Sequence, residues 1–105
     1  MEFYEHLYTG ERAAKKRYFI LQSLRDKKIY PDIYVITPAS GGNNLLDIYS
    51  CSEFFSPWNE KKNFLVAGIA LGYAEACELA GQIVNEVYRK TGSFDVRHYL
   101  LRNMR

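Results

Sequence analysis

The sequence predicts a single α+β domain over residues 1–105: a three-stranded antiparallel sheet with two long helices on one face, in α-β-β-β-α order, and a short C-terminal helix. Three observations predict this fold. Residues 11–28 and 73–91 repeat apolar side chains with the period of an amphipathic helix. Three shorter segments, rich in β-branched, aromatic and other apolar residues, have the length of strands: 33–37, 45–50 and 64–70. A length of 105 residues suits one domain with a modest core.

The N-terminal part of the chain is expected to be helical. Residues 1–10 should form a short helical turn whose rings pack on the domain, because apolar residues recur at Phe3, Tyr4, Leu7 and Tyr8. The first long helix, at 11–28, has one apolar side made of Ala13, Ala14, Ile20, Leu21 and Leu24. Arg17 projects from the middle of that side. We favour a stem along the core edge with the guanidinium in water over a buried, anion-binding arginine.

A β-hairpin is expected next. Pro31-Asp32 ends the first helix, and the β-branched run at 33–37 forms the first strand. The Pro-, Gly- and Asn-rich segment 38–44 predicts a turn into the second, antiparallel strand at 45–50. The Ser-Gly-Gly-Asn tip of this turn is interpreted as a plain hairpin connection in preference to a mobile ligand-binding loop.

A strand-to-helix unit forms the centre of the predicted fold. Residues 64–70 are apolar at both alternating sets of positions, which predicts a central strand covered on both faces. Gly68 and Gly72 mark the turn into the helix at 73–91, and Gly92 suits a left-handed cap that ends it. We interpret the turn as structural, because its spacing matches neither a P-loop nor a dinucleotide-binding motif.

Two further segments complete the chain. Residues 51–63, interrupted by Pro57, are expected to be irregular. Ser93 can cap a short helix at 94–104.

Composition narrows the class of protein. The hydrophobic fraction of 48% excludes disorder as the default, and the net charge of +2 is too small to indicate nucleic-acid binding by itself. Cys51 and Cys77 lack metal or redox spacing, and Cys77 is expected to be a buried, small hydrophobe. The N-terminus has no secretory pattern, and no apolar run reaches membrane-spanning length. We therefore expect a reduced, cytoplasmic protein.

An apolar surface is the leading functional prediction. Aromatic residues make up 15% of the chain, more than so small a core can hold. The second face of the predicted sheet is too apolar to be bare, and must be covered by a terminal segment, by residues 54–58 or by a second subunit. A homodimer or another protein partner is our first expectation. The candidate interface residues are Tyr34, Tyr49, Phe54, Phe55 and Trp58. For the last three we prefer the interpretation that they cover the edge of the sheet, and an exposed apolar patch for a partner is the alternative.

A basic cluster supports a second functional hypothesis, a nucleic-acid-associated module that uses the first helix. Its candidate anion or nucleic-acid contacts are Lys15, Lys16, Arg17 and Lys27. A solvated helix face is the preferred interpretation, because such charge clusters on helices are common.

Catalytic and metal-binding signatures are weak in this sequence. Neither His6 nor His98 has a ligand-type neighbour at the spacing of a zinc site. A nucleophilic pair of His98 with Cys51 or Cys77 is left open, but no paired carboxylates have acid–base spacing. We therefore expect a non-enzymatic domain without metal or cofactor.

A family resemblance covers most of the chain. The residues that carry it are Leu7-Tyr-Thr-Gly-Glu11 with Lys15-Lys16, Tyr34-Val-Ile-Thr37, Leu46-Asp-Ile48, Val66-Ala-Gly-Ile-Ala70, Gly72-Tyr-Ala-Glu-Ala76, and Tyr88 through Thr91-Gly92 to Phe94-Asp-Val-Arg97. These segments resemble a family of small, uncharacterised bacterial proteins of the clostridial type. The resemblance implies no activity and no site residues.

The α-β-β-β-α order also resembles that of double-stranded RNA-binding domains. That family reads RNA with a Gly-Pro-x-His loop and a Lys-Lys-x-Ala-Lys helix start. The hairpin turn at 38–44 has no histidine, and the helix after Gly72 begins with acidic residues. The resemblance therefore extends to shape alone, and shape does not carry function.

Overall fold

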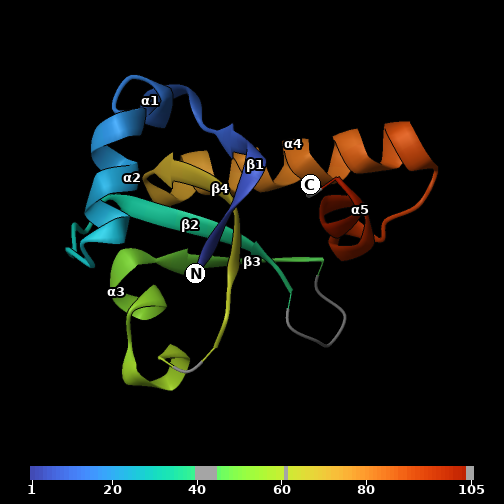
Figure 1. Ribbon diagram of the computed structural model, residues 1–105. Coiled ribbons are helices and arrows are strands. Elements are labelled where there is room, and N and C mark those ends of the chain that lie inside the picture. The colour runs from blue at the N-terminus through green and yellow to red at the C-terminus, as the bar shows by residue number, and fades with distance from the viewer. Residues whose placement is uncertain (40–44, 61, 104–105) are drawn as a thin grey trace.

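The computed structural model describes residues 1–39, 45–60 and 62–103, and has a four-stranded mixed sheet with helices on both faces (Figure 1). The strand order is β1-β4-β2-β3. The elements in chain order are β1 (Glu2–Thr9), α1 (Glu11–Ala14), α2 (Arg17–Arg25), β2 (Ile33–Pro38), β3 (Leu46–Ser50), α3 (Cys51–Phe54), the 3-10 helix η1 (Pro57–Asn59), β4 (Leu65–Leu71), α4 (Tyr73–Thr91) and α5 (Val96–Arg102).

The three predicted strands form as expected, but the prediction of a three-stranded antiparallel sheet is wrong. β2 pairs antiparallel with both β3 and β4, while the N-terminal segment forms a fourth strand, β1, parallel to β4. The predicted helical turn failed because a four-residue spacing of apolar residues fits a strand as well as a helix. The N-terminal segment that contains β1 pairs with the backbone N–H and C=O groups on the outer edge of β4. For example, Gly10 N donates to Ile69 O at 3.0 Å. The observed order therefore also departs from that of double-stranded RNA-binding domains.

The predicted first helix at 11–28 is two helices. α1 ends at Ala14 and α2 begins at Arg17, with a break at Lys16, whose φ of −127° and ψ of 26° are not helical. α1 and α2 have different contacts on either side of this break. The Glu75 carboxylate accepts the N–H groups of Arg12 and Ala13 and fixes α1, while α2 packs its own apolar side on the sheet.

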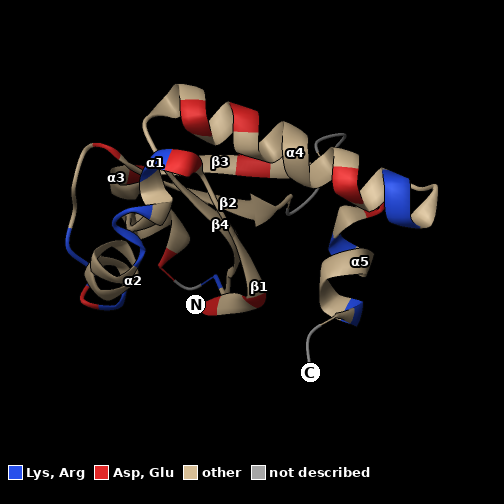
Figure 2. Cartoon of the chain, turned by 90° about the horizontal axis from the view of Figure 1, so that it is seen from above, with Lys and Arg blue, Asp and Glu red and all other residues tan. Residues whose placement is uncertain are grey.

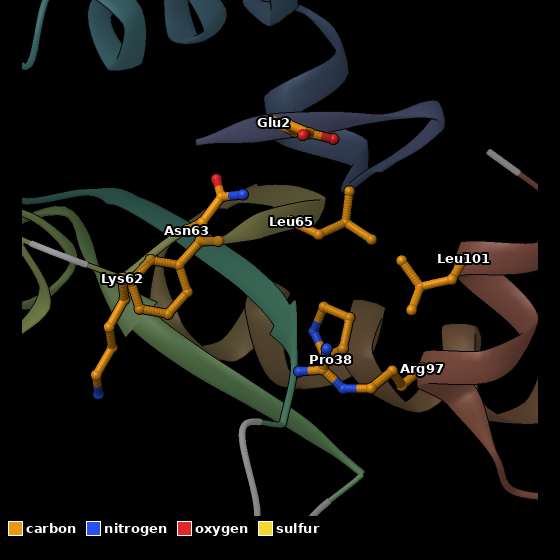
Figure 3. Close-up of a pocket in the computed structure, with 8 residues that line it drawn as sticks. Glu2, Pro38, Lys62, Asn63, Leu65, Arg97 and Leu101 are labelled. Atoms are coloured by element: carbon orange, nitrogen blue, oxygen red, sulfur yellow. The ribbon is translucent and has the colours of Figure 1, made fainter. Parts of the chain in front are cut away.

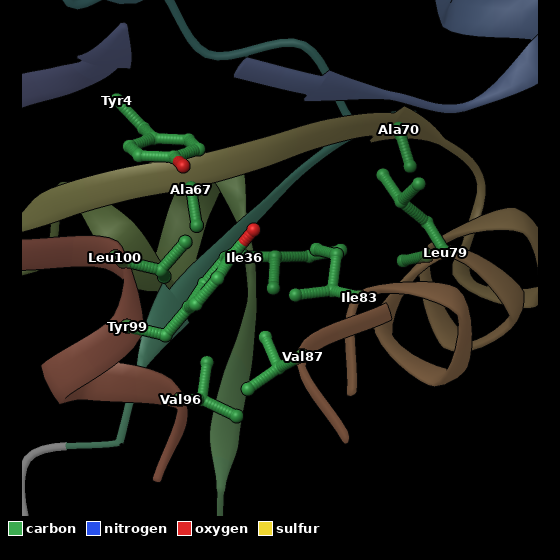
Figure 4. Close-up of a cluster of buried hydrophobic side chains, with 11 residues drawn as sticks. Tyr4, Ile36, Ala67, Ala70, Leu79, Ile83, Val87, Val96, Tyr99 and Leu100 are labelled. Carbon is green, nitrogen blue, oxygen red and sulfur yellow. The ribbon is translucent and has the colours of Figure 1, made fainter. Parts of the chain in front are cut away.

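The two long helices lie on opposite faces of the sheet, which corrects the prediction that they share one face. α4 and α5 pack on one face, around a core that includes Ile36, Ile83 and Leu100 (Figure 4). α1, α2 and α3 cover the other, around Ile20, Val35 and Ile69. The predicted apolar second face is therefore covered by the chain's own helices, as the two-sided apolar pattern of β4 requires.

The C-terminal half follows the prediction closely. α4 spans the predicted residues and ends at Gly92, whose φ of 72° is left-handed. α5 is capped by Asp95, which accepts from His98 N, rather than by Ser93. The segment predicted to be irregular holds α3 and η1; the start of α3 has a capping box of Ser50 and Glu53. The predicted hairpin tip and the end of the last helix, at 104, lie outside the described residues.

Candidate functional site

Three of the five predicted interface residues form an aromatic cluster on the α2 face of the sheet. Tyr49 and Phe54 contact Phe64, with ring centroids 5.5 and 5.0 Å from that of Phe64, and Phe55 contacts Phe54 at 5.1 Å. Phe54 is only 4% exposed. This cluster therefore covers the sheet, which is the preferred interpretation of the sequence for Phe54 and Phe55. Trp58 stands outside it and is 88% exposed.

The fifth residue, Tyr34, lies on the opposite face and leads to a different surface. Its half-buried ring makes an edge contact with Tyr73 of α4 at 5.8 Å between centroids. Tyr73 begins a stripe along the side of α4 that turns toward β3. We call this stripe the α4 flank; its residues are Tyr73, Cys77, Ala80, Gly81, Val84 and Tyr88.

The α4 flank exists because the apolar side of α4 is wider than the sheet beneath it. The fully buried residues Ala76, Ile83 and Val87 face the sheet. The flank continues the apolar side past them and is exposed at Tyr73, Cys77, Gly81 and Tyr88. The prediction that Cys77 is buried was therefore wrong. Helical periodicity indicates an apolar side but not how much of it the sheet covers.

An apolar groove of about 560 Å³ runs between the α4 flank and the start of β3. Leu45 and Leu46 form one wall, and Gly81 and Val84 belong to the other. At its end the rings of Tyr88 and Phe94 stack at 4.6 Å, with 47% and 51% of their surfaces exposed. A Cβ atom added at Gly81 would meet nothing within 4 Å. The groove can therefore accept apolar groups from outside.

β3 is also an open edge of the sheet. Among the described residues it pairs only with β2, so its outer N–H and C=O groups face away from the sheet. β1, at the other edge, is protected by a register irregularity and by exposed Glu2 and Glu5. β3 carries one charge, Asp47, and no lysine, proline or bulge. We call β3, the α4 flank, Leu45 and Phe94 together the β3–α4 surface.

Three of the four predicted basic residues lie at the break between α1 and α2, while Lys27 follows the C-terminal end of α2. Lys15, Lys16 and Arg17 are all exposed there, beside Tyr18, which is 80% exposed. The Arg17 guanidinium donates to Thr9 Oγ1 at 2.8 Å. This agrees with the expectation that Arg17 is not a buried arginine. Acidic residues recur along α4, whose last turn is basic at Arg89 and Lys90 (Figure 2).

The described residues offer little nucleophilic or metal chemistry. Cys51 is fully buried, its thiol donates to the Lys28 carbonyl at 3.3 Å, and burial raises its pKa. Cys51 therefore cannot form the pair with His98 that the sequence left open, because His98 is exposed on the other side of the sheet. In the part of the chain that the structure describes, no group of three His, Cys, Asp or Glu side chains could hold a metal ion.

Another hollow, of about 490 Å³, lies between the N-terminal end of β4 and α5 (Figure 3). Leu65 and Leu101 face each other across it, and Arg97 donates to the Ala39 carbonyl at 3.1 Å. Lys62 extends away from both leucines (Figure 3). Glu2 is the hollow's one acidic lining residue. The hollow thus presents no acid–base pair of carboxylates.

Two polar contacts were not predicted because their partners are distant in sequence. The Glu75 carboxylate accepts the N–H groups of Arg12, Ala13 and Leu71 at 2.7, 3.2 and 2.8 Å. The Tyr8 hydroxyl donates to the Glu86 carboxylate, and burial together with this bond raises the pKa of Tyr8. Both contacts tie the polar side of α4 to the N-terminal segment, opposite the α4 flank.

Comparisons of the chain with protein-family models, curated proteins and solved structures find no match. The search for a membrane-spanning helix, made over the described residues, finds none long and apolar enough.

Proposed function

We propose that this chain is a small, non-enzymatic domain that associates with itself through the β3–α4 surface. The observation that carries the proposal is an exposed apolar flank of the longest helix beside an open strand edge. Apolar patches of this kind on a small domain mark interaction sites. The free thiols of Cys51 and Cys77 support a reducing, cytoplasmic location.

Gly81 gives separate support to this surface. Glycine within a helix destabilises it by about 1 kcal/mol relative to alanine, so an exposed glycine in the middle of α4 costs stability. No neighbour within the described chain requires the missing side chain, because the space around it is open. Close approach of a partner accounts for the glycine.

The proposal predicts that Tyr88→Glu weakens self-association. The charge would lie in the apolar groove, next to Phe94, where burial by a partner is costly. We expect about a 30-fold or larger rise in the dissociation constant, about 2 kcal/mol, since truncated aromatic anchors typically cost this much. Light scattering across a dilution series measures it.

Gln82→Glu is the matched control for Tyr88→Glu. It adds the same charge to the same helix, but Gln82 is exposed beside Glu78, away from the groove. The solution mass of the Gln82→Glu chain should equal that of the wild type at each concentration of the dilution series. Equal dissociation constants for the Tyr88→Glu and wild-type chains would remove this surface from the proposal.

A second candidate function, contact with a polyanion such as nucleic acid, is favoured by the basic corner at the α1–α2 break. Three exposed cations stand beside the exposed ring of Tyr18, and a base can stack on such a ring while the cations meet phosphates. Lys27, the fourth predicted contact, follows the opposite end of α2 and is not part of this corner.

Charge reversal tests the second candidate. Lys15→Glu with Lys16→Glu should reduce binding to single-stranded DNA by about tenfold or more at low salt, because each phosphate contact adds to the salt-dependent affinity. Both side chains are exposed, so the fold should be unaffected. Fluorescence anisotropy at two salt concentrations measures it, and absence of wild-type binding at low salt would end this candidate.

A further inference from the structure

We propose that the partner of the β3–α4 surface is a second copy of this chain whose β3 pairs antiparallel with the first β3, so that two four-stranded sheets become one continuous sheet. This inference rests on the proposed self-association and specifies its geometry. Two-fold pairing of identical edge strands is antiparallel and closed, which produces a dimer and no further growth at that edge.

The sequence of β3 is complementary to itself in one register. If Ile48 lies opposite Ile48 of the second copy, Leu46 lies opposite Ser50, and Asp47 lies opposite Tyr49. The phenol can donate to that carboxylate, as Tyr49 already does within one chain at 3.4 Å. A register centred on Asp47 would instead oppose two carboxylates, which is unfavourable.

The same two-fold pairing would also bury the apolar residues that line the groove. Leu46 and Ile48 pack with Ala80 and Val84 on the α4 face of the sheet. Pairing two β3 strands brings a second set of these residues beside the first, on the same face. The uncovered groove of one copy is then continued by that of the other, and apolar surface is removed from water in both.

The helix dipoles favour the same arrangement. The two-fold axis places the two copies of α4 antiparallel on one face of the continuous sheet. The positive N-terminal end of each helix then lies toward the negative C-terminal end of the other.

Cysteine pairing tests the register. In a Cys77→Ser chain, Ile48→Cys should form a covalent dimer on mild oxidation, because Ile48 faces itself across the axis. Leu46→Cys, on the same strand and the same face, is the control. Its copies would lie about 13 Å apart along the strand, beyond the reach of about 7 Å that a disulfide allows. We expect about tenfold more covalent dimer from Ile48→Cys, since only its geometry permits the bond.

Amide hydrogen exchange of the wild type provides a readout without substitution. Exchange at residues 46–50 should slow when protein concentration rises past the dissociation constant. Slowed exchange with selective pairing of Ile48→Cys supports the inference. A dimer that Tyr88→Glu disrupts, but without protection of β3 and with equal crosslinking at both positions, overturns the strand pairing and leaves the proposed function standing. A monomer at every concentration overturns both.

Discussion

A Gly81→Arg chain should be a folded monomer at concentrations where the wild type is a dimer. Gly81 lies in the middle of the α4 flank, and a Cβ placed there meets nothing within 4 Å. The monomer therefore has room for the new side chain. In the dimer the arginine would lie in the apolar groove, where an unpaired charge and its bulk both oppose docking.

Gly81→Arg should destabilise the dimer but stabilise the folded monomer. The dissociation constant should rise by about 100-fold or more, about 2.7 kcal/mol, the size expected for a lesion at the centre of an interface. The helix itself should gain about 0.8 kcal/mol, because arginine is a better helix former than glycine. The measurement is solution mass together with urea unfolding at a concentration low enough for the wild type to be monomeric.

Gln82→Arg is the control for Gly81→Arg. It adds the same side chain at the next position of α4, which is exposed near Glu78. Its dissociation constant should remain within about threefold of the wild type, since exposed charge changes away from an interface have small effects. A Gly81→Arg chain that dimerises as well as this control would show that the α4 flank is not an interface.

Glu75→Ala should be the most destabilising substitution of an exposed or half-exposed residue in this chain. The carboxylate joins three separate segments, since it accepts N–H groups from the end of β4 at Leu71 and from α1 at Arg12 and Ala13. Removing it leaves these donors without that acceptor, and we expect a loss of about 2–4 kcal/mol, discounted for partial exposure to water. Urea unfolding measures the free energy of unfolding.

The contribution of Glu75 should depend on pH. Burial alone would raise the pKa of this carboxyl, but its three backbone donors and the charge of Arg12 hold the pKa below its ordinary value of 4.5. A carboxyl with a lowered folded-state pKa stabilises the fold fully above its unfolded pKa. That stabilisation disappears as pH falls through the folded value. The difference in unfolding free energy between the wild type and Glu75→Gln should therefore shrink as pH falls below about 4.5.

Two further variants isolate the role of the Glu75 carboxylate. Glu78→Ala removes another acidic residue from the first turns of α4, but Glu78 is exposed, so the loss should stay within about 0.5 kcal/mol. Gly10→Ala should instead destabilise the fold as Glu75→Ala does, because the added methyl would overlap the Glu75 carboxylate. A Glu75→Ala chain as stable as Glu78→Ala would contradict this account of the contact.

The sequence predicts local elements of this fold better than their assembly. The strands at β2, β3 and β4 and the helix α4 follow from patterns contained within each segment. β1 could not be recognised, because spacing of four residues is shared by helix and strand. α1, which ends just before the break at Lys16, is bound by Glu75 some 60 residues away in sequence, and no local pattern reports such a contact.

The sequence predicted that aromatic residues would be exposed, but not which of them form the candidate surface. The aromatic surplus correctly indicated that rings exceed the capacity of the core, and Trp58, Tyr73 and Tyr88 are indeed exposed. Which rings are exposed depends on how far each helix extends over the sheet. β1 covers the outer edge of β4, so β3 is the edge that stays open, and the α4 flank lies beside it.

Self-association is the central claim of this account, and light scattering across a dilution series tests it most directly. The claim predicts a mass at twice the chain's 12.2 kDa for the wild type, which falls to the mass of one chain on dilution and for Gly81→Arg at all concentrations. The result should change little with salt, because the contact is mainly apolar. A wild-type chain that keeps the mass of a monomer throughout the series would contradict the claim.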